Sequence, residues 1–195
     1  MATQLEFSSP LAPPLPLLRF SVAQYHMLGD LGVLTPEDKV ELLEGWIVEN
    51  RNQRPVHGYF VGMLSEWFQN RVPEGYIVRC QLPITTERSE PEPDIAIVSG
   101  GHHDYRDLHP TGNDCRLIIE VSDTSLDKDR AKASIYQSPG VNEYWIFNIG
   151  GKCIEQYRFS KSCDVLSPVI VTSEMQAMIQ INGQELILPL SELFK

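Results

Sequence analysis

Two apolar segments of this chain each carry a single carboxylate, and this combination constrains the fold more than any other feature. The first is Asp94 followed by the run Ile95–Val98, and the second is the segment 117–122, which contains Glu120. Apolar, β-branched segments of this kind form strands buried in a sheet. Removing a charge from water is costly unless the group is paired or binds a cation. The two acids are therefore expected to share a proton or to hold a divalent metal ion between neighbouring strands.

A helix that supplies cations is predicted shortly beyond the second acid. The segment 127–132 (DKDRAK) begins this helix, and Lys132 and Tyr136 stand four residues apart on one face of it. Two acids followed by a lysine are typical of a site that hydrolyses phosphodiesters. Exposed lysines are also common on helices, so the residues alone leave open whether Lys132 belongs to a site or to a solvated face.

The order of these residues resembles that of a known family. Asp94, Glu120, Lys132, Tyr136 and the segment 140–146 (GVNEYWI) follow one another as in the bacterial Uma-type family of restriction endonucleases, in the PD-(D/E)XK nuclease superfamily. Further matching segments, in the order of the family, are 19–25, 41–45, His57, 81–84 and 190–194. The resemblance covers roughly residues 17–195.

This resemblance implies both a fold and a function. The fold is α/β (α+β), with a restriction-endonuclease-like core in which helices flank a mixed central β-sheet, N-terminal helices and a C-terminal β extension. The function is metal-dependent hydrolysis of double-stranded DNA by an endonuclease. Asp94 and Glu120 would bind Mg²⁺ or Mn²⁺, with the carbonyl of Val121 as a third ligand. Lys132 would orient the nucleophile, because Ser122 occupies the position where the superfamily usually has its lysine.

The candidate residues also have structural explanations. Candidates for additional members of the site are Glu41, His57, Gln81, Ser122 and Tyr136. On an acidic helix, Glu41 is better explained as part of a solvated face. His57 fits a helix-terminus histidine as well as a contact to phosphate or to metal-bound water. Asp94 could cap a strand, and Glu120 could form a structural salt bridge, although a mid-strand position makes that second explanation unattractive.

Periodicity and turn chemistry predict the elements of this core. Apolar residues recur at three- and four-residue spacing from Phe60 to Phe68, which indicates an amphipathic helix with a wide buried face. Helices are expected at 21–28, 35–45, 57–70 and 128–137, strands at 46–49, 76–82, 94–98, 116–121, 143–148 and 153–159, and a hairpin at 179–187. The last strand and the hairpin are expected to extend the central sheet.

The balance of charge weighs against a DNA-binding protein. The chain has 16 basic and 26 acidic residues, a formal charge of −10, whereas proteins that bind duplex DNA usually present a basic surface. A local basic rim could coexist with this excess, formed by Arg51, Arg54, Arg88, Lys128, Arg130 and Lys132. The second hypothesis is therefore a catalytically inactive nuclease-fold domain that binds DNA or a protein partner.

Length and composition predict one domain with a short arm. Residues 17–195 are expected to form a single domain, and the proline-rich residues 1–16 a loose tail or an arm laid on a partner. A homodimer is expected, in contact through this arm or through the hairpin around Asn182 and Gly183. No apolar stretch reaches the about 20 residues of a membrane span, and no secretory signal is recognisable, so a cytoplasmic protein without a membrane partner is expected. The four cysteines are expected to be free thiols, since their spacing fits neither a zinc site nor a redox pair.

Overall fold

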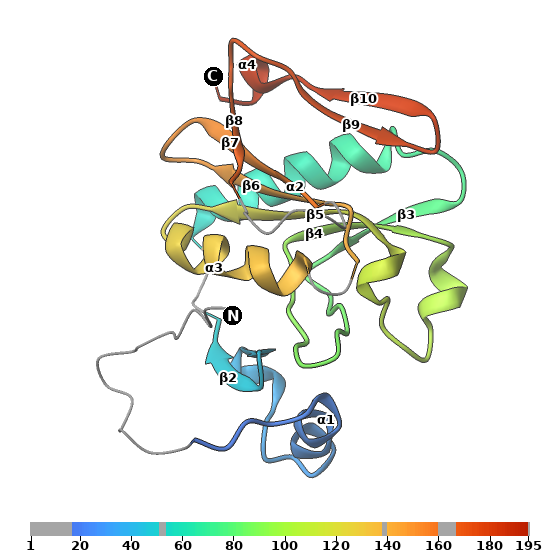
Figure 1. Cartoon of the computed structure of the whole chain (residues 1–195), viewed down its shortest axis with the longest axis vertical. Coiled ribbons are helices and arrows are strands. Elements are labelled where there is room, and N and C mark those ends of the chain that lie inside the picture. The colour runs from blue at the N-terminus through green and yellow to red at the C-terminus, as the bar shows by residue number, and fades with distance from the viewer. Residues whose placement is uncertain (1–16, 51–53, 138–139, 160–166, 195) are drawn as a thin grey trace, which may run out of the picture.

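A mixed β-sheet forms the centre of the protein (Figure 1). The computed structural model describes residues 17–50, 54–137, 140–159 and 167–194, so the predicted arm at 1–16, Arg51 and Cys163 lie outside the described residues. The six-stranded sheet has the order β3-β4-β5-β6-β7-β8. Its strands are β3 (Tyr76–Cys80), β4 (Ile95–Ser99), β5 (Cys115–Ser122), β6 (Glu143–Asn148), β7 (Cys153–Arg158) and β8 (Val169–Thr172). Among these pairings, β5 with β6 is parallel and the others are antiparallel, as a mixed sheet requires.

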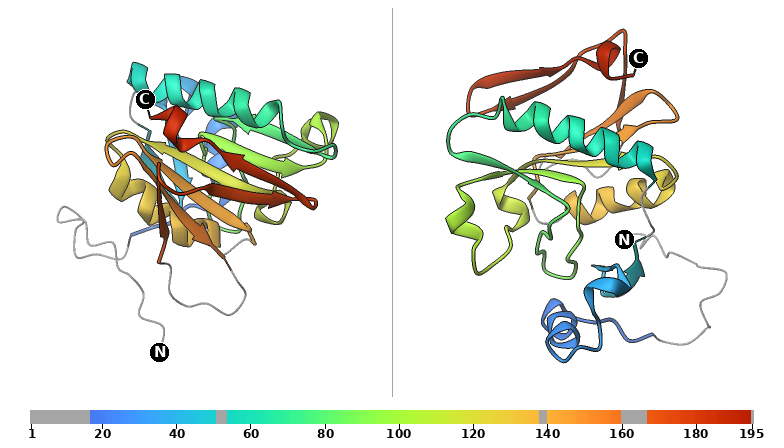
Figure 2. Two further views of the ribbon diagram at one scale, coloured as in Figure 1. Left: turned by 90° about the horizontal axis from the view of Figure 1, so that it is seen from above. Right: turned by 180° about the vertical axis from the view of Figure 1, so that it is seen from behind.

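Helices α2 (Pro55–Gln69) and α3 (Leu126–Gln137) lie on opposite faces of this sheet (Figure 2). Because strand side chains alternate, Ile119 and Val121 of β5 pack in the core on the α2 side, while Ile118 packs on the α3 side. The apolar spacing predicted for α2 is confirmed, since its apolar stripe is buried against the sheet. Glu120 shares the face of Ile118, and this places its carboxylate on the α3 side of the sheet.

The N-terminal part differs from the prediction. Helix α1 (Val22–Asp30) begins with the expected capping box, but the helix predicted at 35–45 is wrong. It stops after a single 3₁₀ turn, η1 (Pro36–Asp38), because Lys39 adopts a left-handed conformation with φ 47°. The chain continues as an antiparallel hairpin of β1 (Val40–Leu43) and β2 (Trp46–Glu49). Its two-residue turn has positive φ at both positions, 51° at Glu44 and 81° at Gly45, as primed hairpin turns do.

This β1–β2 hairpin is held on the segment that leads into β4. The amide of Glu90 donates to the carbonyl of Leu42 at 2.7 Å, and the amide of Gly45 donates to the carbonyl of Arg88 at 2.9 Å. Figure 1 shows the hairpin and α1 below the central sheet, with the hairpin between α3 and α1. The hairpin thereby carries residues from the N-terminal part of the chain to one end of the sheet.

The C-terminal part is also partly different from the prediction. The hairpin of β9 (Ala177–Ile181) and β10 (Gln184–Leu188), with its turn at Asn182 and Gly183, is confirmed. It forms a two-stranded sheet of its own instead of extending the central one, because its inner side chains pack over the α2-side core. Strand β8 and the short helix α4 (Leu190–Leu193) were not predicted. Among the described residues, no helix combines the length and apolar character that a bilayer span requires.

Arg130 connects α3 to β7 of the sheet through a salt bridge with Glu155. Its Nε donates to Oε2 of Glu155 at 2.9 Å and its Nη2 to Oε1 at 2.6 Å, and the Glu155 residue is only 2% exposed. Arg130→Lys is expected to lower the free energy of unfolding by about 1–2 kcal/mol, because lysine cannot reproduce the two-pronged contact. Urea unfolding measures this loss. Arg106→Lys, on an exposed pair with Asp107, is the control and should change nothing measurable; an equal loss in both variants would contradict the prediction.

Candidate active site

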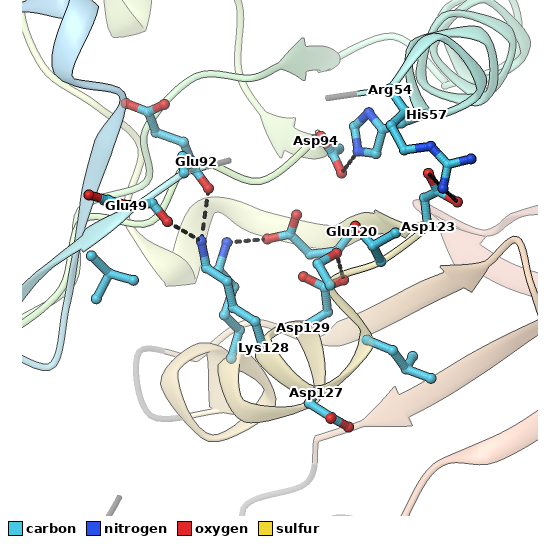
Figure 3. A pocket seen from close by; sticks show the side chains of 16 residues that line it. Glu49, Arg54, His57, Glu92, Asp94, Glu120, Asp123, Asp127, Lys128 and Asp129 are labelled. Carbon is cyan, nitrogen blue, oxygen red and sulfur yellow. Dashed lines mark hydrogen bonds and ion pairs between the residues drawn. The ribbon is translucent and has the colours of Figure 1, made fainter. Parts of the chain in front are cut away.

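A cavity of about 760 Å³ opens where β5, α3, the start of α2 and the end of β2 meet. Asp94, His57, Glu120 and Lys132 all line it. Figure 3 shows Asp94 and Glu120 pointing into the same hollow, with His57 beside Asp94. The two acids that the sequence singled out therefore converge on one cavity, as expected from their positions on neighbouring strands.

Asp94 directly precedes β4 and is almost fully buried, with 6% of the residue exposed. Its Oδ2 accepts a hydrogen bond from the backbone amide of Val121 at 2.8 Å and lies 3.0 Å from Nε2 of His57. Burial alone would lower the pKa of His57, but the hydrogen bond to Asp94 and the charge of that carboxylate outweigh it and raise the pKa. His57 and Val121 therefore fix the orientation of the Asp94 carboxylate.

Glu120 lies near the end of β5 with its carboxylate buried. Its Oε1 accepts from Nζ of Lys132 at 2.8 Å and from the hydroxyl of Tyr136 at 3.1 Å. Burial raises the pKa of Glu120 to about 8, because the nearby lysine offsets the loss of hydration only in part. Lys132 and Tyr136 lie four residues apart on one face of α3, and this spacing brings both to one carboxylate.

Lys132 and Glu41 complete this network. Lys132 is 3% exposed, and its Nζ lies 3.0 Å from Oε2 of Glu41 as well as 2.8 Å from Glu120. Glu41, on β1, is fully buried and also pairs with Nζ of Lys128 at 2.8 Å. Burial raises the pKa of Glu41, but the two lysines outweigh this effect, and the pKa lies below its ordinary value. The interpretation of Glu41 as a solvated residue on an acidic helix is therefore wrong, and so is that of Lys132 as an exposed helix lysine.

The remaining candidates occupy different places. Ser122 is buried on the same face of β5 as Glu120, whereas the side chain of Val121 packs in the core on the α2 side. Gln81 does not line the cavity of Asp94 and Glu120 but a neighbouring one. His102 and His103 lie in an exposed 3₁₀ turn.

Several residues that line the cavity were not predicted as site members. Glu92 stands two residues before Asp94, a spacing that places both side chains on one side of an extended segment and could have indicated it. Asp129, 4% exposed, accepts a hydrogen bond from the Ser125 hydroxyl at 2.6 Å. Burial raises the pKa of Asp129. Acids in the first turn of a helix usually interact with the helix dipole at the surface, so the position of Asp129 in the sequence does not indicate that it is buried.

The donor set of the cavity fits a hard divalent cation. Its lining acids are Glu49, Glu92, Asp94, Glu120, Asp123, Asp127 and Asp129, against the cations Arg54, Lys128 and Lys132. Among the described residues, no group of three or more acids, histidines or cysteines has the arrangement of a complete metal site. Mg²⁺ is commonly held by one or two carboxylates together with water and substrate phosphate, so Asp94 and Glu120 are sufficient in number and kind.

Comparisons with known proteins agree with this fold. The crystal structure of a "putative nuclease" from Anabaena variabilis superposes with a TM-score of 0.67 and 15% sequence identity, over 85% of this chain and 94% of the other. No curated protein matches the chain significantly. Residues 22–183 match the family Uma2, described as "putative restriction endonuclease". Since this match spans most of the sequence, the chain belongs to the Uma2 family of putative restriction endonucleases.

Proposed function

We propose that this chain is a metal-dependent DNA endonuclease that hydrolyses phosphodiester bonds. The observation that carries the proposal is the convergence of Asp94, Glu120 and Lys132 on one cavity. Asp94 and Glu120 are the residues that would hold Mg²⁺ or Mn²⁺, with the Val121 carbonyl as a third ligand. When bound there, a divalent ion supplies charge stabilisation at the phosphate and a more acidic water molecule.

The protein's own residues supply position and charge in this proposal. His57 and the Val121 amide hold the Asp94 carboxylate in one orientation. Tyr136 does the same for Glu120. Lys132, held between Glu41 and Glu120, would orient the attacking water and reduce the negative charge of the cavity. The acid-lined cavity repels the DNA backbone unless a cation compensates, which supports a requirement for metal.

A plasmid-nicking assay tests this function. Supercoiled DNA incubated with the wild-type protein and Mg²⁺ or Mn²⁺ is expected to be nicked or linearised, and EDTA is expected to prevent this. Glu120→Gln, which keeps the shape of the side chain and removes its charge, should abolish cleavage. Absence of cleavage with retained DNA binding would instead favour the catalytically inactive domain.

We further propose that the chain acts as a homodimer. Helix α1 buries none of its residues, and Leu18, Met27, Leu31 and Val33 near it are 74%, 57%, 71% and 62% exposed. A second copy would remove this apolar surface from water.

Light scattering at tens of micromolar is expected to give twice the mass of one chain. Leu31→Glu should yield a monomer, since it places a charge in the proposed contact, whereas Leu108→Glu, at a residue 60% exposed elsewhere, should leave the dimer intact. A monomeric wild type would contradict the proposal.

A further inference from the structure

A second cavity of about 910 Å³ adjoins the one that contains Asp94 and Glu120. The two cavities share Asn50 and Glu92 in their walls, so a ligand that extends past these residues can occupy both. The second cavity lies between α1, the start of β1 and the segment after β3. Its lining includes Tyr25, His26, Thr35, Gln81 and His109. The second cavity is thus lined mainly by rings and neutral groups, whereas the first is lined by many carboxylates.

His26 is held in this cavity by a buried acid. Its Nε2 lies 2.6 Å from Oε1 of Glu90, and Oε2 of Glu90 accepts the Thr85 hydroxyl at 2.7 Å. The Glu90 side chain is 4% exposed, whereas that of His26 is 49% exposed. A buried carboxylate therefore fixes a ring that is open to the cavity. When Nε2 donates to Glu90, Nδ1 remains as an acceptor for a ligand.

His109 gives the cavity a second imidazole. Burial lowers the pKa of His109 and outweighs the opposing charge of Glu90, which favours the neutral form of this ring. The charged residues that line the cavity are Asp30, Lys39 and the shared Glu92. This lining has too little positive charge for a phosphate. It matches a flat, neutral ligand whose edge both donates and accepts hydrogen bonds.

Two residues that line the second cavity have a strained backbone. Gln81 and Lys39, both in the lining, have φ of 51° and 47°, a left-handed conformation that non-glycine residues rarely adopt. The backbone amide of Gln81 donates to the carbonyl of Pro93 at 3.1 Å and to that of Asp94 at 3.2 Å. Such strain persists where the surrounding structure enforces it, and it is common at binding sites. Here the strained residue Gln81 lines the second cavity, and its backbone is hydrogen-bonded to that of Asp94, which lines the first.

We propose that the second cavity binds a nucleobase of the DNA strand whose phosphate lies in the first cavity. This inference rests on the proposed endonuclease function. His26, His109 and the side-chain amide of Gln81 would contact the edge of an unstacked base. Because both cavities share Asn50 and Glu92 in their walls, one strand could cross from the first cavity to the second. A volume of about 910 Å³ lies in the range of small-molecule sites and accommodates a base with its sugar. The cavity would thereby determine base preference next to the cleaved bond.

Histidine ring signals in NMR test this assignment without requiring cleavage. The chain has five histidines, and each can be assigned with a His→Ala variant. Dinucleotides carrying each of the four bases are titrated into the protein beside the matching mononucleotides, with Ca²⁺ present to offset the acids that line the first cavity. Saturable shifts are expected at His26 and His109 and not at the exposed His102 and His103. Dinucleotides should bind at least tenfold more tightly than mononucleotides if the base arrives on a strand.

Two variants examine the wall of the cavity. Gln81→Gly removes the side-chain amide and relieves the strained backbone, and His109→Ala removes one imidazole. Each variant should weaken dinucleotide binding at least fivefold. His103→Ala is the matched control and should bind as the wild type does. Unchanged affinity in both cavity variants, or no saturable shift at His26 and His109, would overturn the proposal.

The remaining outcomes separate this inference from the endonuclease function. Equal affinity for mononucleotides and dinucleotides would overturn the assignment to a DNA strand and point to a free nucleotide. Shifts at His26 and His109 without plasmid cleavage would support base binding and reject the endonuclease. Plasmid cleavage without these shifts would keep the endonuclease and reject the base site.

Discussion

Asp94→Asn is expected to reduce plasmid cleavage by at least about 100-fold. Residues that merely support a metal ligand typically cost 10–100-fold when replaced, so loss of a ligand should reach or exceed the upper end of that range. Asparagine keeps an oxygen that can accept from the Val121 amide, and this contact is 2.8 Å in the wild type. The fold should therefore persist, and the loss should reflect the missing charge.

Initial rates of nicking in Mn²⁺ measure this effect, and circular dichroism verifies the fold. Asp107→Asn, at an exposed surface acid, is the control and should cleave at the wild-type rate. A reduction of less than tenfold for Asp94→Asn would remove Asp94 from the proposed metal site. A similar reduction in the control would show that the assay responds to net charge instead.

Lys132→Met is expected to lower the free energy of unfolding by about 3–5 kcal/mol, the loss typical when one partner of a buried ion pair is removed. Methionine fills a similar volume, so the cause would be the uncompensated carboxylates of Glu41 and Glu120. Without the lysine, the pKa of Glu120 should rise further above its value of about 8. A folded-state pKa above the unfolded value gives stability that is present at low pH and lost as pH rises. The variant should thus be more destabilised at pH 8 than at pH 5.5.

Urea unfolding at both pH values tests this expectation. Lys128→Met is the matched control, because Lys128 also pairs with Glu41 but its side chain is 28% exposed; its loss should be clearly smaller. Adding Glu120→Gln to Lys132→Met should recover part of the stability, since it removes one of the unpaired charges. No recovery in the double variant, or equal losses in the two lysine variants, would contradict the explanation.

The elements that the sequence predicted correctly are those with strong local patterns. Helix α2 has a wide apolar stripe, β4 is an apolar run directly preceded by Asp94, and the apolar run of β5 is interrupted by Glu120. The face shared by Glu120 and Ser122 follows from the alternation of strand side chains. In the same way, the turn at Asn182 and Gly183 follows from the preference of that residue pair for positive φ.

What could not be predicted depends on contacts that are distant in sequence. Thr35 to Asp38 have a good helix start, yet β1 follows because its residues pair with β2 and with the segment around Glu90. The buried Glu41 carboxylate is compensated by Lys128 and Lys132, which lie beside it in the folded protein. Local propensity contains no record of such partners. The independent sheet of β9 and β10 has the same origin, since packing over the α2-side core decided its position.

The contact between Glu41 and Lys132 also bears on the synthesis of the protein. The β1–β2 hairpin leaves the ribosome about 90 residues before the helix that carries its buried lysine partner, which corresponds to roughly 5–20 s of translation. During this interval, the Glu41 carboxylate lacks the two lysines that compensate its charge in the folded protein. The Glu41 carboxylate therefore meets Lys132 only after α3 has been made, and nascent chains that end before α3 lack the α3 residues that line the cavity. The proposed endonuclease activity would thus be absent while the chain is still being made.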